Sequence, residues 1–260
     1  MGSVWGGASQ AGGGRRQTSG GKDWNEPMTG STGWPEPPRT ESCVLCSGGL
    51  DSSVLLAWAA QHAPAQPVYV RAGLAWERLE LETLQRVLQP SGRVRPLAIL
   101  DFDVRDLYPP SHWAVRGAPP GYDTPDEDVY LPGRNILLLS KAAVFAASRR
   151  INRILLGPLA GNPFPDATAR FFRAMSAALS LGLAHTLAVE APFAAVRKAD
   201  VIRLGASLGV PLGATLSCMN PREGVHCGLC SKCRERRDAF AEAGLDDPTR
   251  YLAPSPRVSP

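Results

Sequence analysis

Residues 42–63 read SCVLCSGGLDSSVLLAWAAQHA, and the pattern of this segment is the strongest indication of the fold. It begins with a short apolar run at 42–46, passes through SGGLDS at 47–52, and ends in an apolar segment of helical length. This order predicts a buried strand, a glycine turn and a helix that starts near Asp51 or Ser52. Because ligands of open parallel sheets bind beyond the carboxyl ends of the strands, the turn is also the first candidate for a binding site.

The SGGLDS loop, residues 47–52, has the composition of an anion-binding turn. Its two glycines let the backbone approach an anion closely, and the helix after it offers unpaired N–H groups and the positive end of its dipole. Ser47 and Ser52 add hydroxyl donors, so we expect a cradle for phosphate. The loop is neither GxxxxGKS/T nor GxGxxG. Asp51 would repel phosphate, and its expected role is to coordinate Mg²⁺ or to brace the loop.

Strand and helix patterns alternate along the following residues. Further strands are predicted at 67–73, 93–101, 153–159 and 185–192, and helices at 75–89, 135–150, 167–182 and 197–209. Residues 104–133 are rich in Pro, Asp and Gly and are predicted to form an irregular insertion. The alternation predicts an α/β fold, a doubly wound parallel sheet of Rossmann type covered by helices on both faces.

A cysteine-rich segment follows the last predicted helix of this series. Its spacing is C-x8-C-x2-C-x2-C, formed by Cys218, Cys227, Cys230 and Cys233. Four thiolates within sixteen residues fit tetrahedral Zn²⁺ in a closed, structural site, and an iron–sulfur cluster is the alternative. The neighbouring His226 is expected not to bind the metal.

Composition excludes several classes of protein. The six cysteines, in a chain without a recognisable export signal, argue against a disulfide scaffold, and Cys43 and Cys46 are expected to be core residues of the first strand. No apolar run reaches the roughly 18–20 residues of a membrane span, so we expect a cytoplasmic protein without membrane contact. A net charge of +4 does not mark a nucleic-acid-binding protein.

The chain is predicted to have four parts. Residues 1–40 form a Gly/Pro-rich disordered arm, in which Trp5, Trp24 and Trp34 are scattered aromatics or docking residues. The other parts are the nucleotide-binding domain at 41–213, the zinc segment at 214–246 and a tail at 247–260.

Further motifs occur in a fixed order after the SGGLDS loop. Leu131-Pro132-Gly133-Arg134-Asn135 opens the helix after the insertion, Ala191-Pro192-Phe193 precedes Lys198, and Thr215-Leu216-Ser217 precedes the first clustered cysteine. Over about residues 43–242 the chain resembles the 7-cyano-7-deazaguanine synthase family (the QueC/ExsB group). This family belongs to the PP-loop ATP pyrophosphatases, which have the adenine-nucleotide alpha-hydrolase-like fold. Its members are similar in having SGGxDS, PGRN and SC-x8-C-x2-C-x2-C.

The resemblance implies an ATP-dependent ligase that forms carbon–nitrogen bonds. Such an enzyme adenylates a carboxylate, forms the amide with ammonia, adenylates the amide oxygen and releases AMP to leave a nitrile. The implied substrates are ATP with Mg²⁺, ammonia and a deazapurine acid, 7-carboxy-7-deazaguanine, in queuosine biosynthesis. No nucleic-acid partner is expected, and a homodimer is left open.

The resemblance also implies roles for individual residues. The nucleotide would be held by Cys46, Ser47, Gly48, Gly49, Leu50, Asp51, Ser52 and Ser53. Asp51 would act through Mg²⁺. Arg134 and Lys198 would neutralise the phosphates or the activated intermediate, and for each of them the alternative is a surface ion pair.

Two strings of the family are replaced in this chain. Tyr69–Glu77 stands where members carry Tyr-x-Gln-Arg-His, and Gly161–Ala167 stands where they carry Ser-Gly-Tyr-Pro-Asp-Cys-Arg. A relative acting on another carboxylate therefore stays open, as does a nucleotide-binding module without turnover. A PP-loop tRNA-modifying enzyme is a further alternative, and its one hint is the basic cluster at 234–237, which is more often a solvated helix face.

Overall fold

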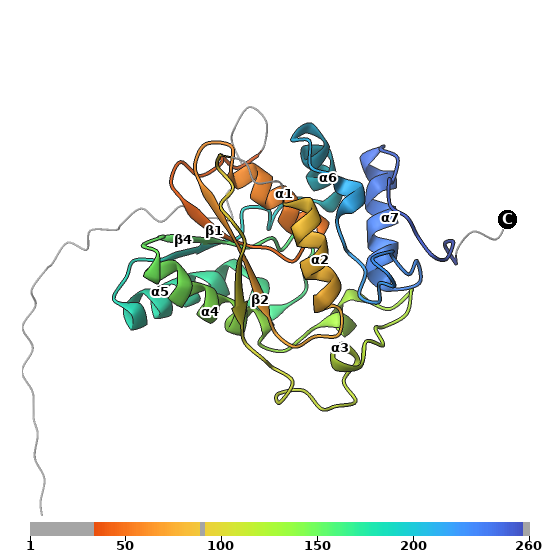
Figure 1. The fold of residues 1–260 in the computed structure, drawn as a ribbon, viewed down its shortest axis with the longest axis horizontal. Coiled ribbons are helices and arrows are strands. Elements are labelled where there is room, and N and C mark those ends of the chain that lie inside the picture. The colour runs from red at the N-terminus through yellow and green to blue at the C-terminus, as the bar shows by residue number, and fades with distance from the viewer. Residues whose placement is uncertain (1–33, 89–91, 257–260) are drawn as a thin grey trace, which may run out of the picture. The chain divides into compact units, whose positions relative to one another are not determined.

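The computed structural model describes residues 34–88 and 92–256, which belong to one compact unit. Among these residues a five-stranded sheet has the order β3-β2-β1-β4-β5, with all neighbours parallel (Figure 1). The strands are β1 Ser42–Leu45, β2 Ala65–Arg71, β3 Ala98–Asp101, β4 Arg153–Leu155 and β5 Ala188–Glu190. The predicted α/β fold with a parallel sheet is confirmed.

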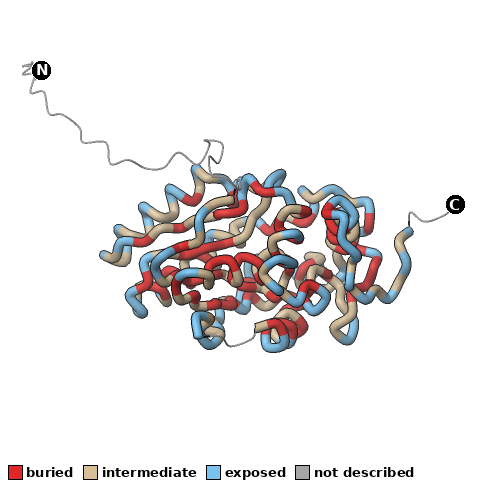
Figure 2. Tube along the Cα trace, turned by 90° about the horizontal axis from the view of Figure 1, so that it is seen from above, coloured by how far each residue is buried: buried red, intermediate tan, exposed pale blue. Residues whose placement is uncertain are grey.

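The middle of the sheet is mostly apolar because both of its faces are covered. Cys43 packs into one hydrophobic cluster and the next residue, Val44, into the other. Ile154 and Leu155 on β4 divide in the same way, because successive side chains of a strand point to opposite faces. Buried residues accordingly run through the middle of the unit (Figure 2). The continuous apolar runs in the sequence therefore come from burial on two sides.

Helices lie on both faces of the sheet (Figure 1). On one side lie α1 Leu50–Ala59 and α2 Glu77–Val87, with α6 Lys198–Ser207 packed on α1 and α7 Ser231–Ala243 packed on α6. The other is covered by α4 Arg134–Ser148 and α5 Ala169–Leu183. The chain first adds β2 and β3 on one side of β1 and then adds β4 and β5 on the other side. Because the crossovers are right-handed, the helices of these two halves lie on opposite faces.

The point where the chain changes direction positions the site. β1 pairs with β2 on one side and with β4 on the other, so the strand order reverses at β1. The connections that leave β1 and β4 therefore diverge to opposite faces and open a crevice at the carboxyl edge. The SGGLDS loop follows β1 and enters this crevice, as the sequence predicts.

The insertion at 104–133 is more regular than its composition predicts. It contains the short helix α3, Trp113–Arg116, and a 3₁₀ helix at Asp126–Val129. His112 caps α3, since its Nδ1 accepts a hydrogen bond from Ala114 N at 3.3 Å. The Trp113 ring stacks on Trp76 with centroids 5.5 Å apart. A single helical turn leaves no periodicity in the sequence, and its stability comes from this tertiary contact.

The expected amino-terminal arm meets the packed unit at Trp34. Residues 1–33, with Trp5 and Trp24, lie outside the described residues. The Trp34 ring packs edge-on against the fully buried Phe193, with centroids 5.8 Å apart. Packing of the described chain thus begins at Trp34, ahead of the predicted boundary at residue 41. None of the helices in the described ranges is both long and apolar enough to traverse a bilayer.

Candidate active site

The backbone of the SGGLDS loop requires glycine at its second position. Gly48 has a φ of +75°, and a Cβ added there would come within 3.0 Å of the Glu80 carbonyl oxygen on α2. Gly48 O in turn accepts a hydrogen bond from Leu216 N at 2.8 Å. The loop is therefore held from both sides, by α2 and by the segment that leads to the cysteines, and a side chain would disturb both contacts.

The serine hydroxyls of the loop are turned toward its own N–H groups. Ser47 N donates to Ser52 Oγ at 3.2 Å, Gly49 N donates to Ser47 Oγ at 3.2 Å, and the two hydroxyl oxygens are 3.4 Å apart. These groups stand at the amino end of α1, where N–H groups and the helix dipole favour an anion. The N–H groups of Ser47 and Gly49 thus donate within the loop, and a bound phosphate would have to replace the serine oxygens as their acceptor.

Three of the predicted nucleotide-site residues have buried side chains. Cys46, Leu50 and Ser53 are 5%, 1% and 7% exposed. Burial raises the pKa of the Cys46 thiol to about 12, and the Ser53 hydroxyl donates to Gly49 O at 2.8 Å. Their side chains support the loop, so a ligand would meet them through the backbone. Cys43 is fully buried too, and the prediction that Cys43 and Cys46 are core residues is confirmed.

Lys198 lies between two carboxylates. Its Nζ is 3.2 Å from Asp51 Oδ2 and 2.6 Å from Glu235 Oε1. Glu235 also binds Lys232 at 2.7 Å, and Lys232 reaches Asp126 of the insertion at 3.5 Å. An alternating chain of five charges therefore connects the SGGLDS loop with α6, α7 and the insertion.

The charge chain controls the ionisation of its inner members. Burial acts to lower the pKa of Lys198, but the charges of Asp51 and Glu235 outweigh it and raise that pKa. Burial acts to raise the pKa of Glu235, but Lys198 and Lys232 together lower it to about 2. Lys198 does form ion pairs, as the alternative expected, but these pairs are buried and not on the surface, because its side chain is only 13% exposed.

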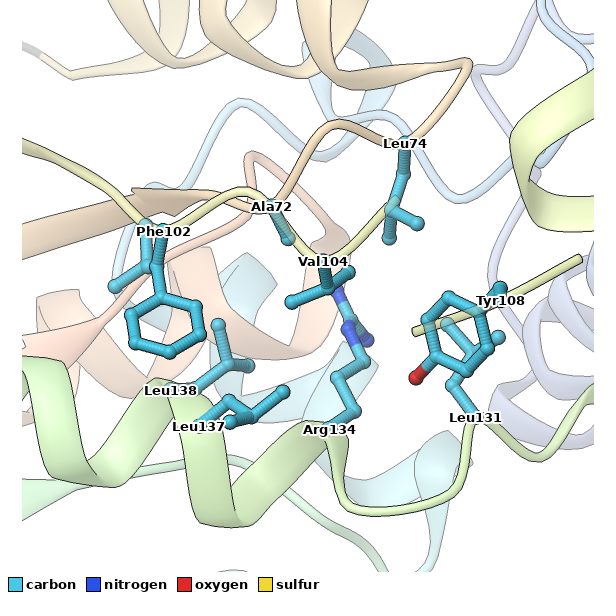
Figure 3. A pocket seen from close by; sticks show the side chains of 10 residues that line it. Ala72, Leu74, Phe102, Val104, Tyr108, Leu131, Arg134, Leu137 and Leu138 are labelled. Atoms are coloured by element: carbon cyan, nitrogen blue, oxygen red, sulfur yellow. The ribbon is translucent and has the colours of Figure 1, made fainter. Parts of the chain in front are cut away.

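Arg134 opens α4 and is oriented by a link to the next loop. Asn135 N donates to Asp166 Oδ2 at 3.0 Å, and Asn135 Nδ2 donates to Asp166 O at 2.9 Å. Arg134 extends from α4 toward Val104 beside a small apolar pocket of about 10 Å³, which has no room for a substrate (Figure 3). Its Nε is buried without a hydrogen-bond partner among the described residues. Within the described residues Arg134 forms no ion pair, so the alternative role of a surface ion pair is not found for it.

A cavity of about 420 Å³ brings the predicted polar residues together. Its wall includes Ser47, Gly49, Asp51, Ser52, Arg134 and Lys198. Residues 156–164 after β4 close another side, and residues 216–219 before the second cysteine close a third. A volume of this size suits a small-molecule ligand and lies where the sheet topology predicts one.

Several residues of the wall carry no signal in the sequence. Glu80, Tyr69, Trp76 and Trp113 line or border the cavity, and Lys232 and Glu235 extend it toward the cysteines. They come from β2, α2, the insertion and α7, and no spacing rule connects them. The one local hint is the i,i+3 spacing of Lys232 and Glu235, which pair on α7.

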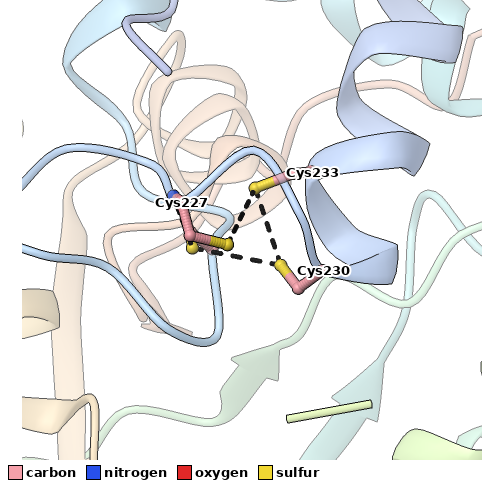
Figure 4. A group of neighbouring side chains, drawn as sticks. Cys227, Cys230 and Cys233 are labelled. Carbon is pink, nitrogen blue, oxygen red and sulfur yellow. Dashed lines mark hydrogen bonds between the residues drawn. The ribbon is translucent and has the colours of Figure 1, made fainter. Parts of the chain in front are cut away.

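The four predicted cysteines form one buried cluster (Figure 4). Their Sγ atoms all lie within 4.8 Å of one another, with separations of 4.0, 3.9 and 3.5 Å between three of the pairs. A tetrahedral site with metal–sulfur bonds of about 2.3 Å has sulfur–sulfur edges of about 3.8 Å. Asn220 N and Cys227 N each donate to Cys218 Sγ at 3.3 Å, which stabilises thiolate. The cluster therefore fits a tetrahedral metal ion.

His226 is outside this cluster, as expected. Its Nε2 accepts a hydrogen bond from Ser217 N at 3.1 Å, and its ring packs on Tyr251. Burial, with the nearby charge of Arg236, lowers the pKa of His226 to about 4. The histidine is thus a neutral structural residue that connects the cysteine segment to the residues before it.

The basic cluster at 234–237 is not a solvated helix face, because its arginines make contacts within the fold. Arg236 is fully buried and binds Thr215 Oγ1 at 2.9 Å and Leu212 O at 2.6 Å. Arg234 donates to Tyr122 O. Arg237 donates to Gly228 O and lies over the ring of Tyr251. All three arginines hold the segment together, so their clustering is explained by contacts within the fold.

Fold and site together define an α/β protein of the doubly wound, Rossmann-like class, with the SGGLDS loop at its switch point and a four-cysteine cluster beside it. A sequence model of the family described as "Queuosine biosynthesis protein QueC" matches residues 41–244. The chain belongs to the QueC family.

Proteins named 7-cyano-7-deazaguanine synthase align with most of the chain. The 7-cyano-7-deazaguanine synthase of Methanopyrus kandleri is 34% identical over 80% of this chain and 97% of its own length. Those of Porphyromonas gingivalis and an Azoarcus species are also 34% identical, over 81% of this chain and 97% and 96% of their own lengths. Among solved structures, the U34-tRNA thiolase NcsA of Methanococcus maripaludis with its 4Fe-4S cluster is 10% identical, with a TM-score of 0.37. The match covers 80% of this chain and 67% of that one, and it is too weak to bear on the metal of this protein.

Proposed function

We propose that this protein is an ATP-dependent carbon–nitrogen ligase that converts 7-carboxy-7-deazaguanine into 7-cyano-7-deazaguanine in queuosine biosynthesis. The observation that carries the proposal is the cavity of about 420 Å³, in which the SGGLDS loop, Asp51, Lys198 and Arg134 meet in a chain of the QueC family. Relatives named for this synthase cover the same residues at 34% identity.

The chemistry explains why such a site needs an anion cradle. A carboxylate is a poor electrophile, and ammonia does not displace its oxygen until adenylation makes that oxygen a good leaving group. Each adenylation is an attack at the α phosphorus of ATP with departure of pyrophosphate, and the protein contributes position and charge stabilisation. Ser47, Gly49 and Ser52 are proposed to hold the departing pyrophosphate, with their N–H and hydroxyl donors at the head of α1.

Asp51 and the cations of the cavity have separate proposed roles. Asp51 Oδ1 is buried without a hydrogen-bond partner among the described residues, which fits a ligand for Mg²⁺ bound with ATP. Such an ion would neutralise phosphate charge. Lys198 keeps Asp51 in place by binding Oδ2, and Arg134 offers a guanidinium to the phosphates or to the activated acid.

The four cysteines are proposed to bind Zn²⁺ as a structural site. The sulfur separations match a tetrahedron, and four thiolates leave no position for a substrate. The ion would fix residues 216–219, which form one wall of the cavity, against α7. No step of the reaction passes through it.

Mass spectrometry of the products tests this function. Purified protein is incubated with Mg²⁺-ATP, ammonia and 7-carboxy-7-deazaguanine, and in parallel with other planar carboxylic acids. We expect AMP, pyrophosphate and the nitrile from the deazapurine acid, and loss of AMP formation in the Asp51→Ala variant. AMP formation with another acid alone would assign a different acceptor, and no AMP with any acid would overturn the ligase assignment.

A further inference from the structure

A carboxyl group that the proposed function leaves without a role lies in the wall of the same cavity. Glu80 on α2 is half-buried, and its Oε2 accepts a hydrogen bond from the Tyr69 hydroxyl at 2.8 Å. The Trp76 side chain donates a second hydrogen bond to it. Two donors from β2 and from the start of α2 therefore fix the carboxyl at the cavity wall. The backbone of Glu80 packs against Gly48, so this wall adjoins the SGGLDS loop.

The surroundings of Glu80 place its ionisation in the neutral range. Burial raises its pKa to about 7, although the charge of Arg134 on α4 and the Tyr69 hydrogen bond act to lower it. The neighbouring carboxylate of Glu77 raises it further, and the hydrogen bond from Trp76 lowers it. A carboxyl group that changes charge near the working pH and lines a cavity is suited to proton transfer.

The other carboxylates of the cavity are engaged elsewhere. Both oxygens of Glu77 accept backbone N–H groups, from Ala72 at 2.5 Å and from Gly73 at 2.9 Å. Asp51 and Glu235 bind the Lys198 ammonium. Within the described residues Glu80 forms no salt bridge, and its hydrogen bonds come from neutral donors. Among the carboxylates of this wall, Glu80 is therefore the one that can take up a proton without breaking an ion pair or a hydrogen bond from the backbone.

The proposed reaction releases protons from nitrogen. When ammonia adds to the adenylated acid, the new C–N bond leaves a positively charged nitrogen that must lose a proton as the C–O bond to AMP breaks. On the way from amide to nitrile both N–H protons are lost. The last one leaves as its electron pair forms the third C–N bond and the C–O bond breaks, with the electron pair departing on AMP.

We propose that Glu80 is the proton acceptor for these steps: its carboxylate takes the proton from the substrate nitrogen and later passes it to water. This inference rests on the proposed function. It assigns a catalytic role to a residue outside the SGGLDS, PGRN and cysteine motifs.

The test uses the carboxamide, 7-amido-7-deazaguanine, with Mg²⁺-ATP, because this half of the reaction needs no ammonia. The pH dependence of nitrile formation is then free of the ammonium equilibrium. Wild-type protein should lose kcat/KM as the pH falls below about 7, the pKa of Glu80. Glu80→Gln should lower kcat by about 10²- to 10⁴-fold and remove that acid limb.

Two further variants make the result specific. Glu82→Gln is the matched control, because Glu82 lies on the same helix, is half exposed and pairs with Arg78 on the surface. It should keep the wild-type rate and profile. Tyr69→Phe removes a hydrogen bond that lowers the pKa of Glu80, so its acid limb should move to higher pH.

The outcomes separate the two proposals. An active wild type whose rate and acid limb survive in Glu80→Gln, or whose limb does not move in Tyr69→Phe, would overturn the role of Glu80 and leave the ligase function intact. A wild type that makes no nitrile from either the acid or the carboxamide would overturn the proposed function, and the role of Glu80 with it.

Discussion

The ammonium of Lys198 on α6 lies 2.6 Å from the Oε1 atom of Glu235 on α7. The same ammonium binds Asp51 at the head of α1, so one side chain joins the candidate phosphate loop to the helix that carries the last cysteine. Removing one partner of such a buried ion pair lowers the stability of the fold strongly, because the other charge is then left without compensation.

A double-mutant cycle on this pair measures the connection. Lys198→Met should lower the free energy of unfolding by about 3 kcal/mol, since it leaves Glu235 and Asp51 without their cation. Adding Glu235→Gln should restore part of that loss, with a coupling energy of about 1 kcal/mol or more in urea unfolding. Strictly additive effects of the two substitutions would mean that the pair does not stabilise the fold.

Gly48→Ala should damage both the loop and the fold. The residue has a φ of +75°, and the added Cβ would come within 3.0 Å of Glu80 O. We expect a loss of about 1–2 kcal/mol in thermal or urea unfolding, with a strong fall in AMP formation. The matched control is Gly182→Ala on α5, whose Cβ meets nothing within 4 Å. It should raise stability by about 0.5–1 kcal/mol, and equal effects of the two substitutions would contradict the strain at Gly48.

Removal of one clustered cysteine tests the metal centre. Cys230→Ser should lower the metal content per chain and unfold the segment around it, because such small sites contribute on the order of 10 kcal/mol to local folding. The metal is measured by elemental analysis, and a colourless protein containing zinc separates Zn²⁺ from an iron–sulfur cluster, which absorbs visible light. Cys43→Ala, a core substitution in β1, is the control and should keep its metal. Full metal content in Cys230→Ser would rule out the four-cysteine site.

The pH dependence of stability should reveal Glu80 independently of catalysis. Its pKa is raised from the ordinary 4.5 to about 7 in the folded protein, so the folded state binds the proton more tightly than the unfolded state. The resulting stabilisation is fully present below the ordinary glutamate pKa and is lost as the pH rises through about 7. In urea titrations across this window Glu80→Gln should have a flatter dependence than wild type. Glu82→Gln should follow wild type, and identical slopes in all three proteins would refute the shifted pKa.

Trp34 should mark where the folded unit begins. Deletion of residues 1–33 should leave Tm and AMP formation unchanged, whereas Trp34→Ala should lower stability by about 2 kcal/mol, because the ring loses its contact with Phe193. Thermal unfolding of the two variants beside wild type decides this. An unaltered Tm in Trp34→Ala would move the start of the folded unit back toward residue 41.

Local patterns predict much of this protein. The strand, turn and helix around the SGGLDS loop follow from apolar runs and glycine, since a buried parallel strand must be apolar on both faces. The cysteine spacing predicts the metal cluster in the same way, because ligands close in the chain can meet with little loss of entropy. The insertion, by contrast, hides its helix α3, which is stabilised by the stacking of Trp113 on a residue 37 positions earlier, Trp76.

The alternation of strands and helices, the SGGLDS loop and the four sulfur ligands can all be predicted from local sequence, because each depends on residues that are neighbours along the chain. Which charges face one another depends on the tertiary structure. It buried Arg236, which the sequence places in a basic surface cluster, put Lys198 between two carboxylates from different helices, and set Glu80 in the cavity wall. The physical reason is that the charge state and partners of a side chain depend on desolvation and on neighbours brought from distant parts of the chain, and no periodicity in the sequence records either.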